Sequence, residues 1–199
     1  WAYRASLHGA IERAPRDAAD CPPGTPQCAS SWSRFQLVNL SSQAVIWGAE
    51  GGVRAYLPLG FDLRATVSWA FGEGPNPAAR PADPALPYEE TQPLSRIPPL
   101  NGTAEARWTH AGTGAWLGAG LRWALAQTRL SLSDRSDARI PIGGTPGFAV
   151  LDLRAGLRVK DRVRATVVFE NVTDAAYRHH GSGVNGPGAG FVVGLDVGL

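Results

Sequence analysis

Residues 148–160 read FAVLDLRAGLRVK, and this stretch decides the fold. Apolar side chains occupy every second position, and the positions between them carry most of the charge. One face would hold Ala149, Leu151, Leu153, Ala155, Leu157 and Val159, and the other Asp152, Arg154, Arg158 and Lys160. Alternation with a period of two residues is typical of a β-strand that has one apolar and one polar face.

The same alternation recurs along the chain. It is clear in Phe61–Phe71, Ala104–Trp108, Leu117–Leu125, Val163–Glu170 and Phe191–Leu199. It is looser from Trp1 to Arg13 and from Trp47 to Leu57. If residues 32–57 form one long strand, the chain has eight strands, and no segment shows a helical period. The sequence therefore predicts an all-β protein.

The connections between these strands indicate how they are arranged. Three are short, at residues 58–60, 110–114 and 160–161, and four are long, at 14–31, 72–97, 132–147 and 174–188. Short and long connections alternate, so an antiparallel up-and-down sheet would place all the short turns at one end. Transmembrane β-barrels of the outer membrane have this asymmetry. A soluble β-sandwich, the alternative, mixes its connections more.

Composition narrows the function classes. Charged residues make up 18% of the 199 residues, and the net charge of +2 gives no reason to expect a nucleic-acid partner. Aromatic residues lie at both ends of the predicted strands, as in the girdles of a membrane barrel: Trp69, Phe71 and Phe169 near the long loops, Phe61 and Trp108 near the short turns. Nucleophile, phosphate-loop and zinc-protease motifs are missing, so no enzyme and no catalytic residues are expected.

Several motifs in residues 44–199 resemble the C-terminal barrel region of TonB-dependent receptors. WGAE at 47–50 is similar to that family's Gly-x-Glu, and RIPP at 96–99 to its Arg-x-Pro-Pro. TPGF at 145–148 resembles the stretch before the third-last strand. ENVTD at 170–174, followed by Tyr177 and Arg178, resembles the end of the penultimate strand, and GPG at 186–188 follows in order. The chain departs from the family at Ala189, where Arg is usual, and at Leu199, where an aromatic residue is usual.

The resemblance implies a 22-stranded barrel with a plugged lumen, of which residues 1–199 would form roughly the last eight strands. The chain starts in mid-pattern without a Met, which favours a fragment whose plug domain and TonB-contacting segment lie upstream. The implied function is energy-dependent uptake of a scarce ligand, such as an iron chelate (siderophore or haem), across the outer membrane of a Gram-negative bacterium. The implied partners are outer-membrane lipid, the plug domain, TonB and the ligand, with no cofactor. A complete eight-stranded barrel with a structural or adhesive role is the second hypothesis.

Candidate sites lie in the long loops. Cys21 and Cys28 are the only cysteines, and a disulfide, two free thiols or a metal site are all compatible with them, the disulfide being favoured. Arg178, His179 and His180 form a donor-rich patch for an anionic ligand, or simply a solvated loop end. No metal site is predicted.

Other residues of these segments are expected to shape the structure. Glycines at 181, 183, 186 and 188 would let the last long loop move as a gate. Asn171 and Asp174 are expected to terminate a strand and shape the loop after it. Asp134 and Asp137 flank a turn and have no evident partner in the sequence. The charged residues of the polar strand faces are expected to pair across strands.

Overall fold

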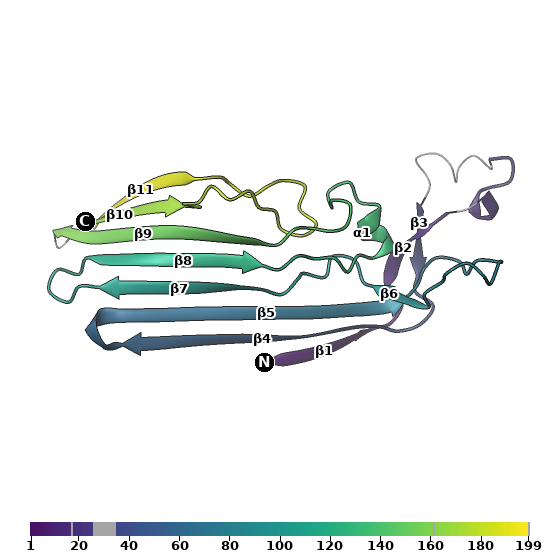
Figure 1. Ribbon diagram of the computed structural model, residues 1–199, viewed down its shortest axis with the longest axis horizontal. Helices are drawn as coiled ribbons and strands as arrows, with labels where there is room; N and C mark the ends of the chain where they lie inside the picture. Colours follow the sequence, from purple (N-terminus) through teal and green to yellow (C-terminus); the bar gives the residue numbers. More distant parts are fainter. Residues whose placement is uncertain (17, 26–34, 161, 199) are drawn as a thin grey trace.

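The computed structural model describes residues 1–16, 18–25, 35–160 and 162–198, and its main feature is one antiparallel sheet (Figure 1). Eight strands follow one another in chain order, each pairing with the next. They are β1 (Ala2–Leu7), β4 (Ala44–Leu57), β5 (Phe61–Pro75), β7 (Asn101–Thr109), β8 (Trp116–Ala124), β9 (Phe148–Lys160), β10 (Val163–Glu170) and β11 (Gly190–Val197). The short β6 (Thr91–Pro93) pairs with the end of β5. The predicted up-and-down antiparallel arrangement is confirmed.

A separate two-stranded sheet lies beyond the long-loop end, formed by β2 (Ile11–Pro15) and β3 (Phe35–Asn39). The predictions of one strand over Trp1–Arg13 and of one strand over residues 32–57 are therefore wrong. The chain leaves the main sheet at Gly9, whose φ of 63° is easy for glycine. The Leu40 amide donates to the Ala10 carbonyl at 2.8 Å, so the two chain segments stay paired where they pass between the main sheet and the small sheet.

All short turns lie at one end of the sheet and all long loops at the other (Figure 1). The turn between β4 and β5 is the 3₁₀ turn η3 (Pro58–Gly60), in which Leu59 and Gly60 both have positive φ. The long loops span 76–100 (β5–β7), 125–147 (β8–β9) and 171–189 (β10–β11). They contain one turn of helix, α1 (Leu132–Arg135), and a second 3₁₀ turn, η1 (Ala18–Asp20), lies between β2 and β3. None of the helices in the described residues has the length and hydropathy that a membrane crossing requires.

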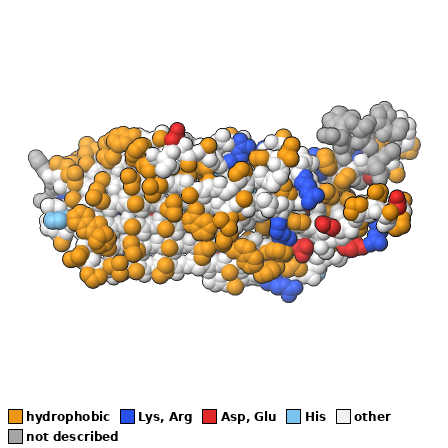
Figure 2. All heavy atoms as spheres, in the orientation of Figure 1, with side chains coloured by type: hydrophobic (Ala, Val, Ile, Leu, Met, Phe, Trp, Pro, Cys, Tyr) orange, Lys and Arg blue, Asp and Glu red, His pale blue; other side chains and the backbone are white. Residues whose placement is uncertain are grey.

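One face of the main sheet is apolar and exposed. Leu153 is 45% exposed, Leu117 58% and Val193 64%, although all three lie on well-paired strands. Figure 2 shows hydrophobic side chains spread over the strand half of this face, and charged side chains gathered toward the loop half. An apolar surface this large is unfavourable in water and favourable against hydrocarbon.

An aromatic cluster marks the long-loop end of the apolar face. The ring centroids of Trp47 and Trp69 are 4.8 Å apart, and those of Trp47 and Phe71 are 5.2 Å apart. The Arg129 guanidinium carbon lies 3.8 Å from the Phe71 ring centroid. Amphipathic rings and a cation at the edge of an aliphatic band are typical of a membrane interface.

The opposite face is polar, and several of its charges pair across strands as expected. Arg54 forms an ion pair with Asp62 at 2.6 Å. Arg154 lies 3.5 Å from both Glu105 and Asp152, and Asp152 is nearly buried. Ion pairs between strands, such as Arg54 with Asp62 and Arg154 with Glu105, stabilise the sheet.

The sheet is open, and its path runs from β1 to β11. An eight-stranded barrel would close by pairing these two strands, and no such pair occurs among the described residues. A β-sandwich would pack a second large sheet on the apolar face, whereas here that face is exposed. A small core of Leu40, Ala44 and Leu94 instead lies at the long-loop end, where the loops fold against the strands.

Candidate functional site

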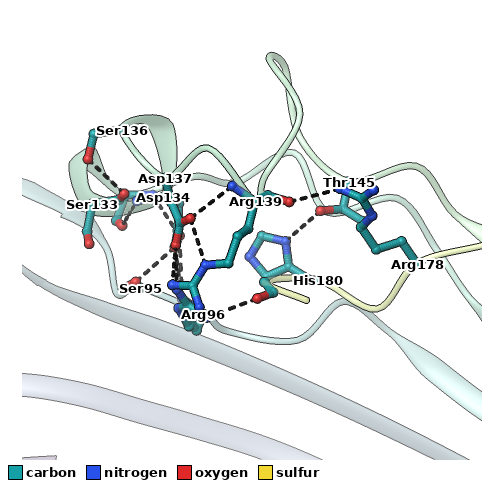
Figure 3. Close-up of polar contacts among 12 residues, drawn as sticks. Ser95, Arg96, Ser133, Asp134, Ser136, Asp137, Arg139, Thr145, Arg178 and His180 are labelled. Atoms are coloured by element: carbon teal, nitrogen blue, oxygen red, sulfur yellow. Dashed lines mark hydrogen bonds and ion pairs between the residues drawn. The ribbon is translucent and has the colours of Figure 1, made fainter. Parts of the chain in front are cut away.

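Arg96 joins the three long loops that follow β5, β8 and β10 (Figure 3). It lies in the β5–β7 loop with a φ of 61°. Its guanidinium forms an ion pair with Asp137 of the β8–β9 loop and donates to the Gly181 carbonyl of the β10–β11 loop at 3.1 Å. The sequence motif that contains Arg96 is therefore a joint between loops.

Asp134 stabilises the same joint and is 1% exposed. Its carboxylate accepts from the Ser95 hydroxyl at 2.8 Å and from the Arg96 amide at 3.2 Å. It also accepts from the Ser131 amide at 3.2 Å, and the Asp134 amide donates to the Ser131 hydroxyl, which together form the capping box of α1. Full hydrogen bonding explains how a carboxylate can be buried here.

Asp137 is the acidic centre of the joint on its solvent side. The Arg139 guanidinium donates to both of its carboxylate oxygens, at 2.9 and 2.8 Å. Hydrogen bonding from Arg139, together with the charge of Arg96, lowers the pKa of Asp137 to about 2. The expectation that Asp134 and Asp137 have no partner is wrong: Arg96 lies 38 residues from Asp134 and 41 from Asp137, and Arg139 is only two residues from Asp137.

The structure gives different surroundings to the three residues predicted to form a ligand patch. Arg178 is half-buried, donating to the Asn185 side chain at 2.8 Å and to the Arg139 carbonyl at 3.3 Å. His180 is also half-buried, with its Nδ1 2.9 Å from the Thr145 hydroxyl. Only His179 is exposed, and its ring stands edge-on to Phe148 at 5.2 Å. Arg178 and His180 therefore hold loops together, and His179 faces solvent.

Burial lowers the pKa of His180, with Arg96 adding to the effect and the two nearby aspartates opposing it. Its Nε2 is buried without a hydrogen-bond partner. Neutral imidazole is thus the favoured form at this position.

A cavity of about 270 Å³ lies beside the joint. All three residues of the predicted patch line it, so the structure does bring them to one cavity. Asn101, Ala124 and Phe148 also line it, and they belong to the polar face of their strands. The remaining lining residues are Arg96, Pro98, Pro99, Leu125, Thr145 and Pro146. This cavity, at the loop end of the charged face, can admit a small ligand to cationic and aromatic groups.

The start of the β10–β11 loop is held by Asn171, which is 1% exposed and has a φ of 47°. Its side chain accepts from the Ala175 amide at 2.9 Å and donates to the Ala175 carbonyl at 3.0 Å. Asp174, also at positive φ, accepts from the Ala189 amide at 2.8 Å. The prediction that Asn171 and Asp174 shape this loop is confirmed.

Two of the loop glycines are required by close packing. A Cβ on Gly186 would lie 2.0 Å from the Tyr177 ring, and one on Gly188 would lie 2.6 Å from the Asp174 carboxylate. Tyr177 is itself 6% exposed. A gate-like motion of this loop stays a prediction, and the packing gives these glycines a separate reason to be present.

The proposed Cys21–Cys28 disulfide includes Cys28, which lies outside the described residues, so it stays a prediction. Across the described ranges, no group of three or more His, Cys, Asp or Glu side chains could hold a metal ion.

The sequence alone missed Arg96, Asp134 and Asp137 as site residues. The RIPP motif was the available signal for Arg96, and the capping-box spacing from Ser131 was the signal for Asp134.

An open, two-faced antiparallel sheet with all long loops at one end defines a segment of an outer-membrane-type β-barrel. Residues 2–172 match the family described as "TonB dependent receptor-like, beta-barrel", and the chain belongs to this family. Receptors of this family reside in the outer membrane. No curated protein matches the chain.

Among the solved structures that share the fold are two transporters and a receptor, and each match covers 98% of this chain. The chain is similar to the copper transporter OprC at 20% identity with a TM-score of 0.70. It is similar to the FrpB iron transporter of Neisseria meningitidis in its apoprotein form (16%, TM-score 0.66) and to a mutant ferric enterobactin receptor, PfeA, of Pseudomonas aeruginosa (16%, TM-score 0.60). This chain spans 28% of the length of each of these proteins.

Proposed function

We propose that residues 1–199 are the C-terminal portion of the barrel of an outer-membrane TonB-dependent transporter. The observation that carries the proposal is the two-faced sheet: an exposed aliphatic face suits lipid, and a charged face suits a wet lumen. In the whole protein these strands would be part of a 22-stranded barrel. The plug domain and the TonB-contacting segment would be supplied by other parts of the polypeptide.

The proposed substrate is a scarce metal ion or its chelate, such as a siderophore or haem. The proteins of similar fold are a copper transporter, an iron transporter and a ferric enterobactin receptor. The cavity beside Arg96 supports a chelate, because it combines cations with the exposed ring of His179. Iron chelates carry carboxylates or other anionic oxygens, which guanidinium groups bind well.

The uptake of radiolabelled iron chelates by cells tests this function. Cells that lack the receptor should lose uptake of one chelate and keep the others, and loss of TonB should also abolish uptake of that chelate. Uptake that is unchanged in both strains would contradict the proposal.

Single substitutions separate ligand contact from loop structure. His179→Ala should weaken chelate binding to cells without changing the amount of receptor in the membrane, because His179 is exposed and holds no loop. Arg178→Ala should weaken binding and also expose the loops to protease, because Arg178 bridges two of them. The triple change of Arg178, His179 and His180 to Ala should show both effects. Parental binding by all three variants would return this cluster to the role of a solvated loop end.

A further inference from the structure

Two arginines lie directly opposite each other on the charged face of the sheet. Arg158 of β9 and Arg164 of β10 are Cα partners in the antiparallel ladder. Their neighbours Leu157 and Ala165 are also partners and belong to the apolar face, so both guanidinium groups project from the charged face. Both side chains are exposed. Directly opposite like charges destabilise a strand pair unless a counter-charge lies close.

Three other arginines of this face have a carboxylate partner. Arg54, Arg122 and Arg154 each form an ion pair with a carboxylate of the same face. Over the part of the chain that the structure describes, no ion pair includes Arg158 or Arg164. Asp196 of β11 is the Cα partner of Arg164 on its other side, so the row across the three strands carries two cations and one anion.

A packed aromatic ring lies beside the arginine pair. The Trp116 ring packs over the backbone of Gly156, where a Cβ would lie 2.4 Å from the indole nitrogen. Gly156 precedes Arg158 by two residues and is therefore on the same face. Arg107 lies over Trp116, with its guanidinium carbon 4.1 Å from the ring centroid. Trp116 and Arg107 therefore form a packed layer beside the arginine pair, near the short-turn end.

We propose that Arg158 and Arg164 together bind one carboxylate side chain, an Asp or a Glu, of the plug domain that fills the lumen. The inference rests on the proposed function, which supplies such a domain. One carboxylate can accept from two guanidinium groups, because it has about four lone-pair sites. A protein side chain is the proposed ligand because the pair lies near the short turn between β9 and β10, at the opposite end of the sheet from the loop cavity, where a folded domain can hold a carboxylate in place. This chain is 28% of the length of its structural neighbours, so most of the polypeptide that could provide the carboxylate lies outside it.

Photo-crosslinking in the full-length receptor tests the contact. A photoreactive benzoylphenylalanine at Thr166, two residues from Arg164 on the same face, leaves both arginines in place. Mass spectrometry should find it joined to a plug peptide that contains Asp or Glu. The same probe at Ala165, on the apolar face, should capture no plug peptide. A Thr166 probe that captures no plug peptide, or only one without a carboxylate, would overturn the inference.

Charge exchange tests the chemistry. Arg158→Glu with Arg164→Glu should speed proteolytic release of the plug by about tenfold or more, whereas Lys at both positions should have a much smaller effect. Changing the captured carboxylate residue to Arg in the double-Glu receptor should restore slow release. Failure of that exchange, or an unchanged release rate in the double-Glu receptor, would overturn the inference.

Chelate uptake by the unmodified receptor is measured separately. Uptake with no crosslink overturns only this inference, whereas a receptor without a plug or without uptake overturns the proposed function.

Discussion

The side-chain amide of Asn171 donates to the backbone carbonyl of Pro187 at 3.0 Å, although the two residues lie at opposite ends of the last long loop. The same side chain also donates to the Ala175 carbonyl, and the backbone amide of Asn171 donates to the buried carboxylate of Asp152 at 2.9 Å. The loop is therefore closed at its base and fastened to the charged face of β9. The Asn and the Asp of the ENVTD motif both serve this closure, since Asp174 accepts from the Ala189 amide.

Replacing Asn171 should open the loop. Asn171→Ala removes three hydrogen bonds and replaces Asn with a residue that tolerates a φ of 47° less well, so a loss of about 2–4 kcal/mol is expected. Asn171→Gly loses the same bonds but tolerates the backbone, and should be milder by about 1 kcal/mol. Hydrogen exchange at the Ala175 amide reports the opening. Equal protection in the parent and both variants would contradict the closure.

Packing and gating make different predictions for the loop glycines. Gly186→Ala forces the Tyr177 ring to move, because the new Cβ would lie 2.0 Å from it, and should destabilise the loop by about 1–3 kcal/mol. Gly183→Ala is the matched control, since its Cβ would meet only the Arg139 side chain at 3.4 Å, and should change stability by less than about 0.5 kcal/mol. Thermal unfolding of the purified receptor measures both. If Gly183→Ala is as harmful as Gly186→Ala, flexibility matters more than packing.

The two faces of β9 should respond differently to exchanged polarity. Leu153→Arg puts a charge against lipid and should reduce the free energy of unfolding by about 2–4 kcal/mol. Arg154→Leu should cost less, because Asp152 keeps Arg122 as an ion-pair partner. Unfolding in lipid vesicles by denaturant compares them, and similar losses in the two variants would refute the assignment of faces.

The loop joint should weaken in mild acid through His180. Burial lowers the pKa of His180, so folding favours the neutral ring. Its contribution to stability is then complete above the unfolded pKa of about 6.5 and declines as the pH falls below that value. Protease digestion of the loops should speed up from pH 7.5 to pH 5.5 in the parent, beyond the change in protease activity, and less so in His180→Gln. A titration midpoint above 6.5 for His180, followed by NMR, would reverse the expected sign.

The Cys21–Cys28 disulfide has a direct test. Protein from an oxidising compartment should be two hydrogens lighter by mass spectrometry than the reduced protein, and should resist alkylation until it is reduced. Two thiols that are alkylated at once would rule the disulfide out.

The strands and their order followed from the sequence alone. A strand in a two-faced sheet must alternate apolar and polar side chains, so residues 148–160 and 163–170 revealed both their extent and their faces. Connection length then decided the topology, because short turns allow only antiparallel neighbours. The ladder of β9 with β10 and the exposure of Leu153 are direct consequences.

Only the tertiary structure decided how the loops are built. Arg96, Asp137 and Gly181 are far apart in sequence, and their contact depends on three loops meeting at one end of the sheet. No periodicity marks such residues, since loop backbones are held by individual hydrogen bonds. For the same reason the predicted patch of Arg178, His179 and His180 was divided into two structural residues and one exposed one. The bend at Gly9 was also invisible in the pattern, because alternation continues on both sides of it while the chain passes from one sheet to another.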